Sequence, residues 1–393
     1  MKMFSSRFTW SLHTNWLSRL LESKRAAGVE ILDLTESNPT QANFEYDEKE
    51  ILAALAAPEA LRYEPSPRGL LDARQAVAGY YNSLGRRVTP DALHLTASTS
   101  EGYAYLFKLL ANPGDEVLAP QPSYPLFDFL TALESVQLIH YPLRYHAAQG
   151  WRIDLETLAA SISTKTRALI IVNPNNPTGS FINHDELAAL NSLCQDHDLA
   201  LIFDEVFSDY GCGHEAQHVA TAVGNTAALT FVLSGLSKTL GLPQMKLAWI
   251  HVSGPQALRE EAQERLDFIS DTYLSVGAPI QHAAAKLLAL RQAMQQQIQA
   301  RIATNEAFLH AQASKLPFVD ILKREGGWCA VLAISKPFAE ENFTVNLLEQ
   351  DNVLIHPGYF FDFEKEGFLV VSLLTDPAIF QEGVARMLAR LAE

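Results

Sequence analysis

The chain has 393 residues, with 30 Lys or Arg against 45 Asp or Glu, which gives a formal net charge of −15 at pH 7. This acidic surplus argues against nucleic acid as a partner, and the length allows one to three domains with a large core. The three cysteines show neither paired spacing nor metal-ligand spacing with histidine, so we expect a reducing compartment and no metal site. No apolar run suits a signal peptide or a membrane span, and we therefore expect a cytoplasmic protein.

The first stretch of the chain is predicted to hold an amphipathic helix over residues 15–27 and a short strand over residues 31–34. A polar turn that contains Asn38 follows this strand. Further on, Tyr63 and Arg68 lie in a Pro-rich loop before a predicted helix over residues 71–84. From residue type alone, these three side chains are ordinary turn and loop residues.

A cluster of hydroxyl residues, Ser98, Thr99 and Ser100, lies between a predicted strand at 93–96 and a helix that continues to residue 110. Hydroxyl groups, free backbone N–H groups and the positive end of the helix dipole make such a helix start favourable for an anion. A plain helix cap uses the same residue types, so the residues by themselves leave both interpretations open.

Predicted strands and helices alternate through the middle of the chain. The strand candidates are residues 116–119, 136–141, 168–172, 199–203, 230–233 and 247–252. The helix candidates are residues 154–161, 184–198 and 255–271. This alternation predicts an α/β fold with a mostly parallel sheet that is covered by helices on both faces.

The last hundred residues change in character. A long helical pattern over residues 279–314 leads to strand candidates at 328–334, 353–356 and 368–374 and to a final helix at 381–392. We interpret them as a smaller α+β domain. The expected division is an N-terminal segment that belongs with the small domain (1–45), a large cofactor-binding domain (46–290) and the small C-terminal domain (291–393).

Three of the predicted buried strands end in polar residues. Asn176 follows the strand at 168–172 in the run NPNNPTG, Asp204 follows the strand at 199–203, and Lys238 follows the strand at 230–233 in the run SGLSK. Ligands of open α/β sheets bind at the ends of parallel strands. Desolvation there lowers the pKa of a lysine and makes its amine nucleophilic, as a Schiff base with pyridoxal phosphate (PLP) requires.

The order NPxNPTG, DEV and SxxSK resembles the class I and II aminotransferases, which are fold-type I PLP enzymes, and the similarity runs over nearly the whole chain. The resemblance implies a large mostly parallel domain with a smaller α+β domain. It also implies a homodimer with shared active sites. The expected reaction is amino-group transfer between an amino acid donor and a 2-oxo acid by a ping-pong mechanism.

The resemblance further implies roles for individual residues. Lys238 would carry PLP and move protons on the substrate, Asp204 would face the pyridine nitrogen, Asn176 would donate to the phenolic oxygen, and Tyr124 would stack on the ring. The residues expected at the cofactor phosphate are Ser98, Thr99, Ser100, Ser237, Lys246 and, from the neighbouring subunit, Tyr63.

Three positions depart from the family pattern. Phe207 replaces a tyrosine, Lys246 replaces an arginine, and Val370 stands where an arginine normally binds the α-carboxylate of the substrate. A buried carboxylate without a cation is costly. We therefore expect another residue to supply the charge, with Arg68 and Lys336 as candidates and Asn38 sharing the contact. The alternative is that the amino donor is not bound through an α-carboxylate.

Other reactions on the same scaffold stay open. A C–S β-lyase and an amine transaminase use the same cofactor residues, because the choice of reaction depends on substrate contacts. A PLP-binding regulatory protein fused to a DNA-binding domain is disfavoured by the acidic charge and because the aminotransferase-like segment begins by Asn38.

Overall fold

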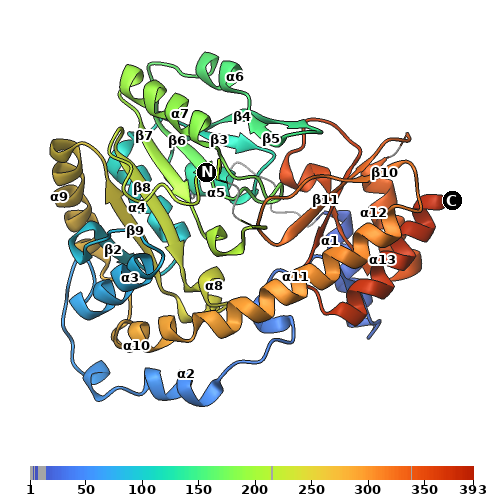
Figure 1. The fold of residues 1–393 in the computed structure, drawn as a ribbon, viewed down its shortest axis with the longest axis horizontal. Helices are drawn as coiled ribbons and strands as arrows, with labels where there is room; N and C mark the ends of the chain where they lie inside the picture. Colours follow the sequence, from blue (N-terminus) through green and yellow to red (C-terminus); the bar gives the residue numbers. More distant parts are fainter. Residues whose placement is uncertain (1–2, 4, 8–14, 214–215, 338) are drawn as a thin grey trace.

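The computed structural model describes residues 3, 5–7, 15–213, 216–337 and 339–393. Its largest element is an eight-stranded sheet whose strand order is β2-β9-β8-β7-β6-β3-β4-β5 (Figure 1). The strands, in chain order, are β2 (Leu93–Thr96), β3 (Glu116–Gln121), β4 (Gln137–His146), β5 (Gly150–Ile153), β6 (Thr166–Val172), β7 (Ala200–Asp204), β8 (Thr230–Gly235) and β9 (Ala248–Ser253).

The centre of this sheet is parallel and its edges are antiparallel. Strands β8, β7, β6, β3 and β4 run in parallel, whereas β2 and β9 at one edge and β5 at the other pair antiparallel with their neighbours. The alternation of strands and helices therefore predicted the sheet correctly. The antiparallel edges follow from connections such as the short turn between β4 and β5, which is too short for a crossover helix.

Helices cover both faces of the sheet, and the core is divided accordingly. Along β7, Leu201 and Phe203 belong to one buried cluster, whereas Ile202 belongs to the other. Alternate side chains of a strand point to opposite faces, so a strand buried on both faces reads as a continuous apolar run. The helices that supply the two clusters are α3 (Leu71–Ser83), α6 (Leu155–Ala160), α7 (His184–His197) and α10 (Ala278–Ala289) on one face, and α4 (Thr99–Leu110), α5 (Leu126–Leu133) and α9 (Gln256–Tyr273) on the other.

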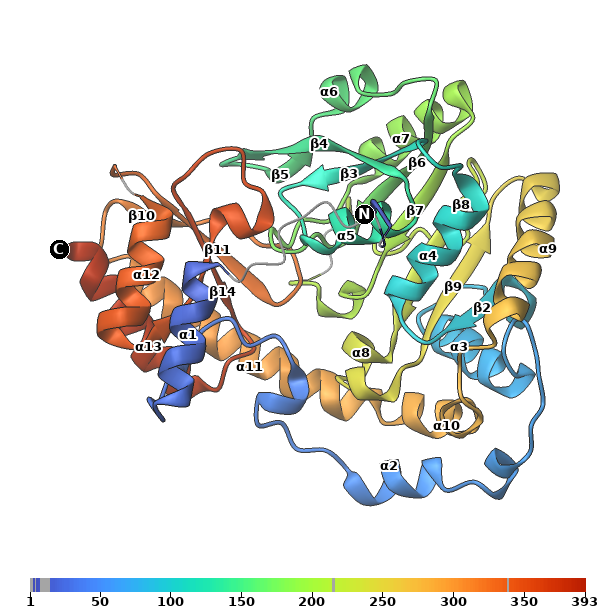
Figure 2. The same cartoon turned by 180° about the vertical axis from the view of Figure 1, so that it is seen from behind.

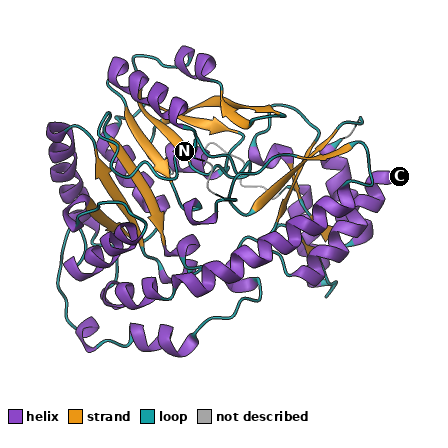
Figure 3. Cartoon of the chain, in the orientation of Figure 1, coloured by secondary structure: helices purple, strands orange, loops and turns teal. Residues whose placement is uncertain are grey.

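A second, smaller sheet forms the core of the C-terminal part of the chain, and Figure 3 shows its strands apart from the large sheet. Its order is β10-β11-β14-β13, and all its pairs are antiparallel. The strands are β10 (Val319–Ile321), β11 (Cys329–Ile334), β13 (His356–Pro357) and β14 (Phe368–Ser372). The helices beside it are α12 (Glu340–Asp351) and α13 (Pro377–Ala392).

The N-terminal segment lies against this small sheet domain. Helix α1 (Trp16–Ala26) contacts α12, and strand β1 (Leu32–Asp33) pairs in parallel with β12 (Val353–Leu354). Both views place α1 beside α12 and α13 (Figures 1 and 2). From there the chain passes through α2 (Glu48–Leu55) to the large domain.

The long helical pattern predicted over residues 279–314 is two helices, α10 and α11 (Arg291–Ala313), that meet at Leu290. At this junction the Arg291 guanidinium donates to the Leu288 carbonyl, which satisfies an acceptor at the end of α10. Helix α11 then runs from the large domain to the small one (Figure 1). Cys194, Cys212 and Cys329 are all free thiols, and no helix among the described residues is long and apolar enough to cross a membrane.

Candidate active site

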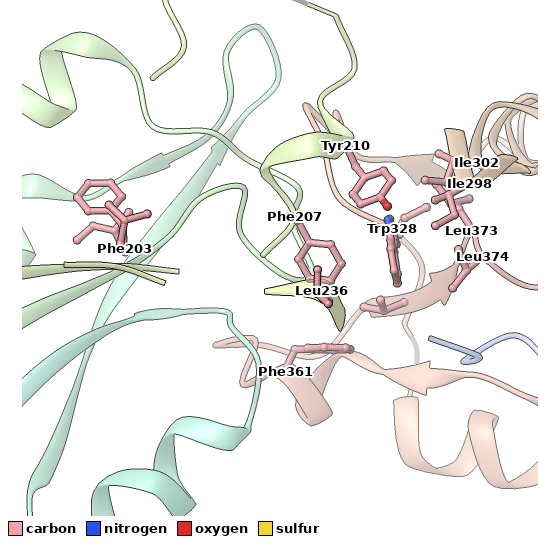
Figure 4. Close-up of a cluster of buried hydrophobic side chains, with 14 of the residues drawn as sticks. Phe203, Phe207, Tyr210, Leu236, Ile298, Ile302, Trp328, Phe361, Leu373 and Leu374 are labelled. Carbon is pink, nitrogen blue, oxygen red and sulfur yellow. The ribbon is translucent and has the colours of Figure 1, made fainter. Parts of the chain in front are cut away.

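Lys238 lies in the one-turn helix α8 (Leu236–Thr239), immediately after β8. Its amino group is 4.7 Å from the ring centre of Trp328 and 5.4 Å from that of Phe207. Figure 4 shows these two rings and Tyr210 gathered where the large and small domains meet. Burial lowers the pKa of Lys238 to about 8, against smaller opposing effects of Cys329, Asp204 and Glu36. A neutral, nucleophilic amine is thus populated near neutral pH.

The position of Lys238 is set by a close approach of two strands. A Cβ on Gly235 would lie 2.8 Å from the Cβ of Ala248, so only glycine lets β8 and β9 come this close. The backbone N–H of Leu236 then donates to the carbonyl of Leu247, and the chain turns into α8. The Tyr210 hydroxyl donates to the Lys238 carbonyl at 2.7 Å and holds the turn from the other side.

Asp204 ends β7, the strand next to β8 in the sheet. One of its oxygens accepts from the Tyr103 hydroxyl at 3.1 Å, and the other accepts from the Val206 N–H at 3.2 Å. Desolvation raises the pKa of Asp204 to about 6, although both hydrogen bonds and Lys238 oppose the rise. The carboxylate is held in a fixed orientation, and a cationic partner would restore its ordinary pKa.

The adjacent acid, Glu205, has different partners. Its carboxylate accepts from the Thr221 hydroxyl at 2.5 Å and from the Ala222 N–H at 2.6 Å, and desolvation raises its pKa to about 8. Adjacent side chains in extended backbone point to opposite sides, so Asp204 and Glu205 of the DEV motif have different surroundings.

Asn176 lies in the loop after β6, and its side-chain carbonyl faces a residue of the small domain. The Cys329 thiol, at the start of β11, donates to it at 3.5 Å. Burial raises the pKa of Cys329 to about 11, so this thiol is neutral at physiological pH. This contact places the start of β11 beside the loop of Asn176, and the preceding Trp328 ring lies beside Lys238. Neither Trp328 nor Cys329 stood out in the sequence, where the only signal was the Gly326-Gly327 pair before an apolar strand.

The hydroxyl cluster forms the start of α4, as its sequence predicts. Ser98 is the N-cap residue, and its oxygen accepts from the Glu101 N–H at 3.1 Å, while Thr99 and Ser100 form the first turn. A Cβ on Gly102 would lie 2.8 Å from a methyl group of Leu233, so glycine allows this helix start to approach β8. The positive end of the α4 dipole consequently lies against the strand that leads to Lys238.

Further polar and aromatic side chains lie around the same strands. The Ser234 hydroxyl, in β8, is buried and has no hydrogen-bond partner among the described residues. Tyr124 lies in the loop after β3, where burial and the charge of Asp204 raise its pKa. Ser237 precedes Lys238 in α8, and Lys246 ends the turn before β9 with a φ of 52°.

Tyr63 is 80% exposed and lines a cavity of about 170 Å³ that Ser275 also lines. The Ser275 hydroxyl donates to the Glu101 carboxylate at 2.6 Å, which connects this cavity to the start of α4. An exposed tyrosine beside the predicted phosphate helix is consistent with a contact to a second subunit.

Arg68 is already engaged within the chain. Its guanidinium forks onto the Asp267 carboxylate with two contacts of 2.6 Å and also donates to the Asp91 carbonyl at 2.9 Å. Lys336 donates to the Leu391 carbonyl and lies over the Phe318 ring. These contacts occupy both cations that we considered for a substrate carboxylate.

Phe207 and Val370, two of the departures from the family pattern, are packed against other residues, and Tyr210 and Asn38 use their polar groups within the chain. Phe207 packs edge-on against Trp328 with 5.2 Å between ring centres. Tyr210, which stands nearby in the sequence, uses its hydroxyl on the Lys238 carbonyl. Val370 is completely buried in β14 between its strand neighbours. Asn38 caps a short 3₁₀ helix by accepting from the Thr40 N–H at 3.1 Å.

Comparison with known proteins identifies the family of this chain. The model of the family described as aminotransferase class I and II matches residues 29–386. Glutamate-pyruvate aminotransferase AlaA of Escherichia coli (strain K12) is 31% identical over 268 residues, which are 67% of this chain and 65% of that protein. Alanine aminotransferase of Mycobacterium tuberculosis (strain ATCC 25618 / H37Rv) is 28% identical over 344 residues, 85% of this chain and 79% of its own.

The fold is also that of solved aminotransferases. The alanine aminotransferase from Pyrococcus furiosus superposes with a TM-score of 0.88 at 21% identity, covering 99% of this chain and all of that one. The family model extends over most of the chain and includes the strand ends that carry Asn176, Asp204 and Lys238. The chain belongs to the class I and II aminotransferase family.

Proposed function

We propose that this protein is a PLP-dependent aminotransferase in which Lys238 holds the cofactor. The observation that carries the proposal is the half-buried Lys238 amine with its lowered pKa, which lies beside the Trp328 and Phe207 rings and next to the strand that ends in Asp204. An isolated structural lysine gains nothing from this position, because desolvation penalises its charged form.

The residues around Lys238 fit the cofactor in chemistry. The start of α4 and the unpartnered Ser234 hydroxyl supply hydrogen-bond donors for a phosphate. Asp204 supplies a buried negative charge for the pyridine nitrogen, Tyr124 a ring face and Asn176 an amide. When bound, PLP supplies an electron-accepting ring that stabilises negative charge at the reacting carbon of the donor.

The chain's own residues then have definite tasks. Asp204, held by the Tyr103 hydroxyl and the Val206 N–H, would supply the negative charge that favours a protonated ring nitrogen in a bound cofactor. The Lys238 amine moves a proton at the reacting carbon, for which a pKa of about 8 is well suited. The Phe207 and Trp328 rings, 5.4 and 4.7 Å from the Lys238 amine, supply an apolar wall beside it.

Reduction with borohydride tests the assignment of Lys238. The protein is loaded with PLP, reduced and digested, and the peptides are mapped by mass spectrometry. We expect the pyridoxyl group on the peptide that contains Lys238, because borohydride makes the lysine–cofactor bond permanent. A label on another lysine would exclude this site, and release of a β-substituent from a donor, instead of amino exchange, would indicate the lyase alternative.

The same proposal includes a cytoplasmic homodimer whose two active sites are shared, with Tyr63 reaching the partner's cofactor phosphate. Isologous pairing is the usual arrangement of such enzymes. The exposed Tyr63 side chain and its connection through Ser275 to the start of α4 support it.

Mixing two inactive variants tests the shared site. In a mixed dimer of Tyr63→Ala and Lys238→Ala chains, one site receives both native residues. We expect activity of about one quarter of the unsubstituted level after subunit exchange, because half of the dimers are mixed and each has one intact site. Tyr63→Ala mixed with the Tyr63→Ala/Lys238→Ala double variant is the control and stays inactive. Recovery in neither mixture would show that Tyr63 acts only within its own subunit.

A further inference from the structure

Glu325 is a buried acid at the boundary of the two domains, and the function proposed above assigns it no task. It lies between β10 and β11 and is 4% exposed. One carboxylate oxygen accepts from the Phe181 N–H at 2.9 Å, and the Glu325 N–H donates to the Gly179 carbonyl at 3.1 Å. Glu325 therefore holds the end of the NPNNPTG run, which contains Asn176, at two points.

Basic side chains balance the buried charge of Glu325. The Arg152 guanidinium, from β5 of the large sheet, donates to its two carboxylate oxygens at 3.1 and 3.4 Å. The His218 ring and the Lys323 ammonium group lie 3.4 and 3.7 Å from one of these oxygens. A buried charge is costly unless it is paired and hydrogen-bonded, and the ionised acceptor strengthens the bond from Phe181.

The two backbone segments that Glu325 joins are in direct contact. A Cβ on Gly179 would lie 2.3 Å from the Gly326 carbonyl oxygen, and Gly179 has a φ of 69°. A Cβ on Gly326 would lie 2.8 Å from a ring carbon of Phe181. Close-packed groups transmit displacements to one another, so a shift of the Glu325 segment moves the loop of Asn176 as well.

Two paths lead from Glu325 to the side-chain amide of Asn176. Along the loop, the Gly179 N–H donates at 2.7 Å to the carbonyl of Asn175, the residue before Asn176. Along the small-domain segment, the chain continues from Glu325 to Cys329, whose thiol donates to the Asn176 side-chain carbonyl at 3.5 Å. With its carbonyl turned to Cys329, the amide keeps its NH₂ group for another acceptor.

We propose that Glu325 is a positioning residue, which holds the Asn176 amide in the orientation that binds the phenolic oxygen of the cofactor. The inference rests on the function proposed above, since Asn176 has this role only when PLP is bound at Lys238. A hydrogen bond to the ionised oxygen favours the form of the cofactor that has lost a proton. Loss of Glu325 should therefore raise the pH at which the bound cofactor changes its absorbance.

A pH titration of cofactor absorbance tests the positioning role. The PLP-loaded unsubstituted protein is compared with PLP-loaded Glu325→Ala. We expect the midpoint to rise by roughly 0.4–1 pH unit in Glu325→Ala, as for the loss of one hydrogen bond. Glu325→Gln keeps a side-chain oxygen that can accept from the Phe181 N–H, so its midpoint should lie between the other two.

A double-mutant cycle with Asn176→Ala shows whether the effect passes through the amide. Asn176→Ala should itself raise the midpoint. Glu325→Ala should then add no further shift in the Asn176→Ala background, because the bond that Glu325 supports is already absent. A Glu325 that only stabilises the fold would lower the melting temperature and leave the midpoint unchanged in both backgrounds.

Asp115→Ala is the matched control. Asp115 also accepts from a backbone N–H, that of Asn112, and is also forked by an arginine, Arg167. It precedes β3, however, and so lies at the end of the parallel strands opposite to Asn176 and Lys238. The control variant should lose melting temperature without any shift of the midpoint.

The outcomes distinguish this inference from the proposal beneath it. An unchanged midpoint in Glu325→Ala, or an equal shift with and without Asn176, would contradict the positioning role and leave Lys238 as the cofactor lysine. If Glu325→Ala does not fold, Glu325→Asp takes its place in the cycle, because the shorter side chain draws the carboxylate away from the Phe181 N–H. If borohydride labels a lysine other than Lys238, the proposed function fails and the inference fails with it.

Discussion

Replacing Lys238 with alanine is expected to lower amino-group exchange by roughly 10³–10⁴-fold, the upper range for loss of a positioned acid–base group. Under the proposed function, the variant loses both the amine proposed to attach the cofactor and the base proposed to move the proton. The measurement is the single-turnover rate of the PLP-loaded protein with its best amino donor. Added methylamine should restore part of the rate, because a small free amine can enter the space left by the side chain.

The control for this prediction is Lys286→Ala, at an exposed position of α10, which should keep full activity. The thermal stability of both cofactor-free variants should be close to that of the unsubstituted protein. Lys286 is exposed, and at Lys238 the relief of desolvation offsets the lost contacts to Trp328 and Phe207. A Lys238→Ala protein that is folded, loaded with cofactor and retains more than a tenth of the rate would contradict the assignment of the lysine.

The second large effect is expected at Asp204. The change Asp204→Asn keeps the size of the side chain but removes the charge that we propose for the ring nitrogen. The rate should fall by roughly 10²–10³-fold, as for other electrostatic contacts to a reacting group. Glu205→Gln is the matched control. Its carboxylate binds Thr221 and Ala222, so its removal should change the rate less than threefold. If the rate falls equally in Asp204→Asn and Glu205→Gln, a specific role for Asp204 is contradicted.

Asp204→Asn should lower the rate but raise the stability of the cofactor-free protein at neutral pH. Burial raises the pKa of Asp204 from its ordinary value of 3.8 to about 6 in the protein without cofactor. Between these two values the unfolded chain releases a proton that the folded chain keeps, so stability falls as the pH rises and the loss is complete above about pH 6. Asp204→Asn does not titrate. Its melting temperature should therefore exceed that of the unsubstituted protein at pH 7–8, with the difference disappearing near pH 4.

The sequence alone predicted the fold class of the protein and the residues that we propose for its active site. Alternating apolar strands and amphipathic helices predict a parallel sheet covered on both faces, and the structure confirms it. Asp204 and Lys238 were proposed for the site because each follows a predicted buried strand and because the three motifs together resemble the class I and II aminotransferases. Motifs and strand patterns of this kind can be recognised in consecutive residues.

Only the tertiary structure shows which residues from distant parts of the sequence lie around Lys238. Trp328 and Cys329 come from the small domain, and the Cys329–Asn176 contact joins positions 153 residues apart. Arg68 pairs with Asp267, which lies 199 residues further along the chain in α9. The charge of this loop arginine is therefore balanced by a carboxylate that local sequence does not reveal. The backbone carbonyl of Glu36 accepts from the Ser372 hydroxyl, 336 residues further along the chain. Such contacts depend on how two domains pack, and no local pattern of residues encodes that geometry.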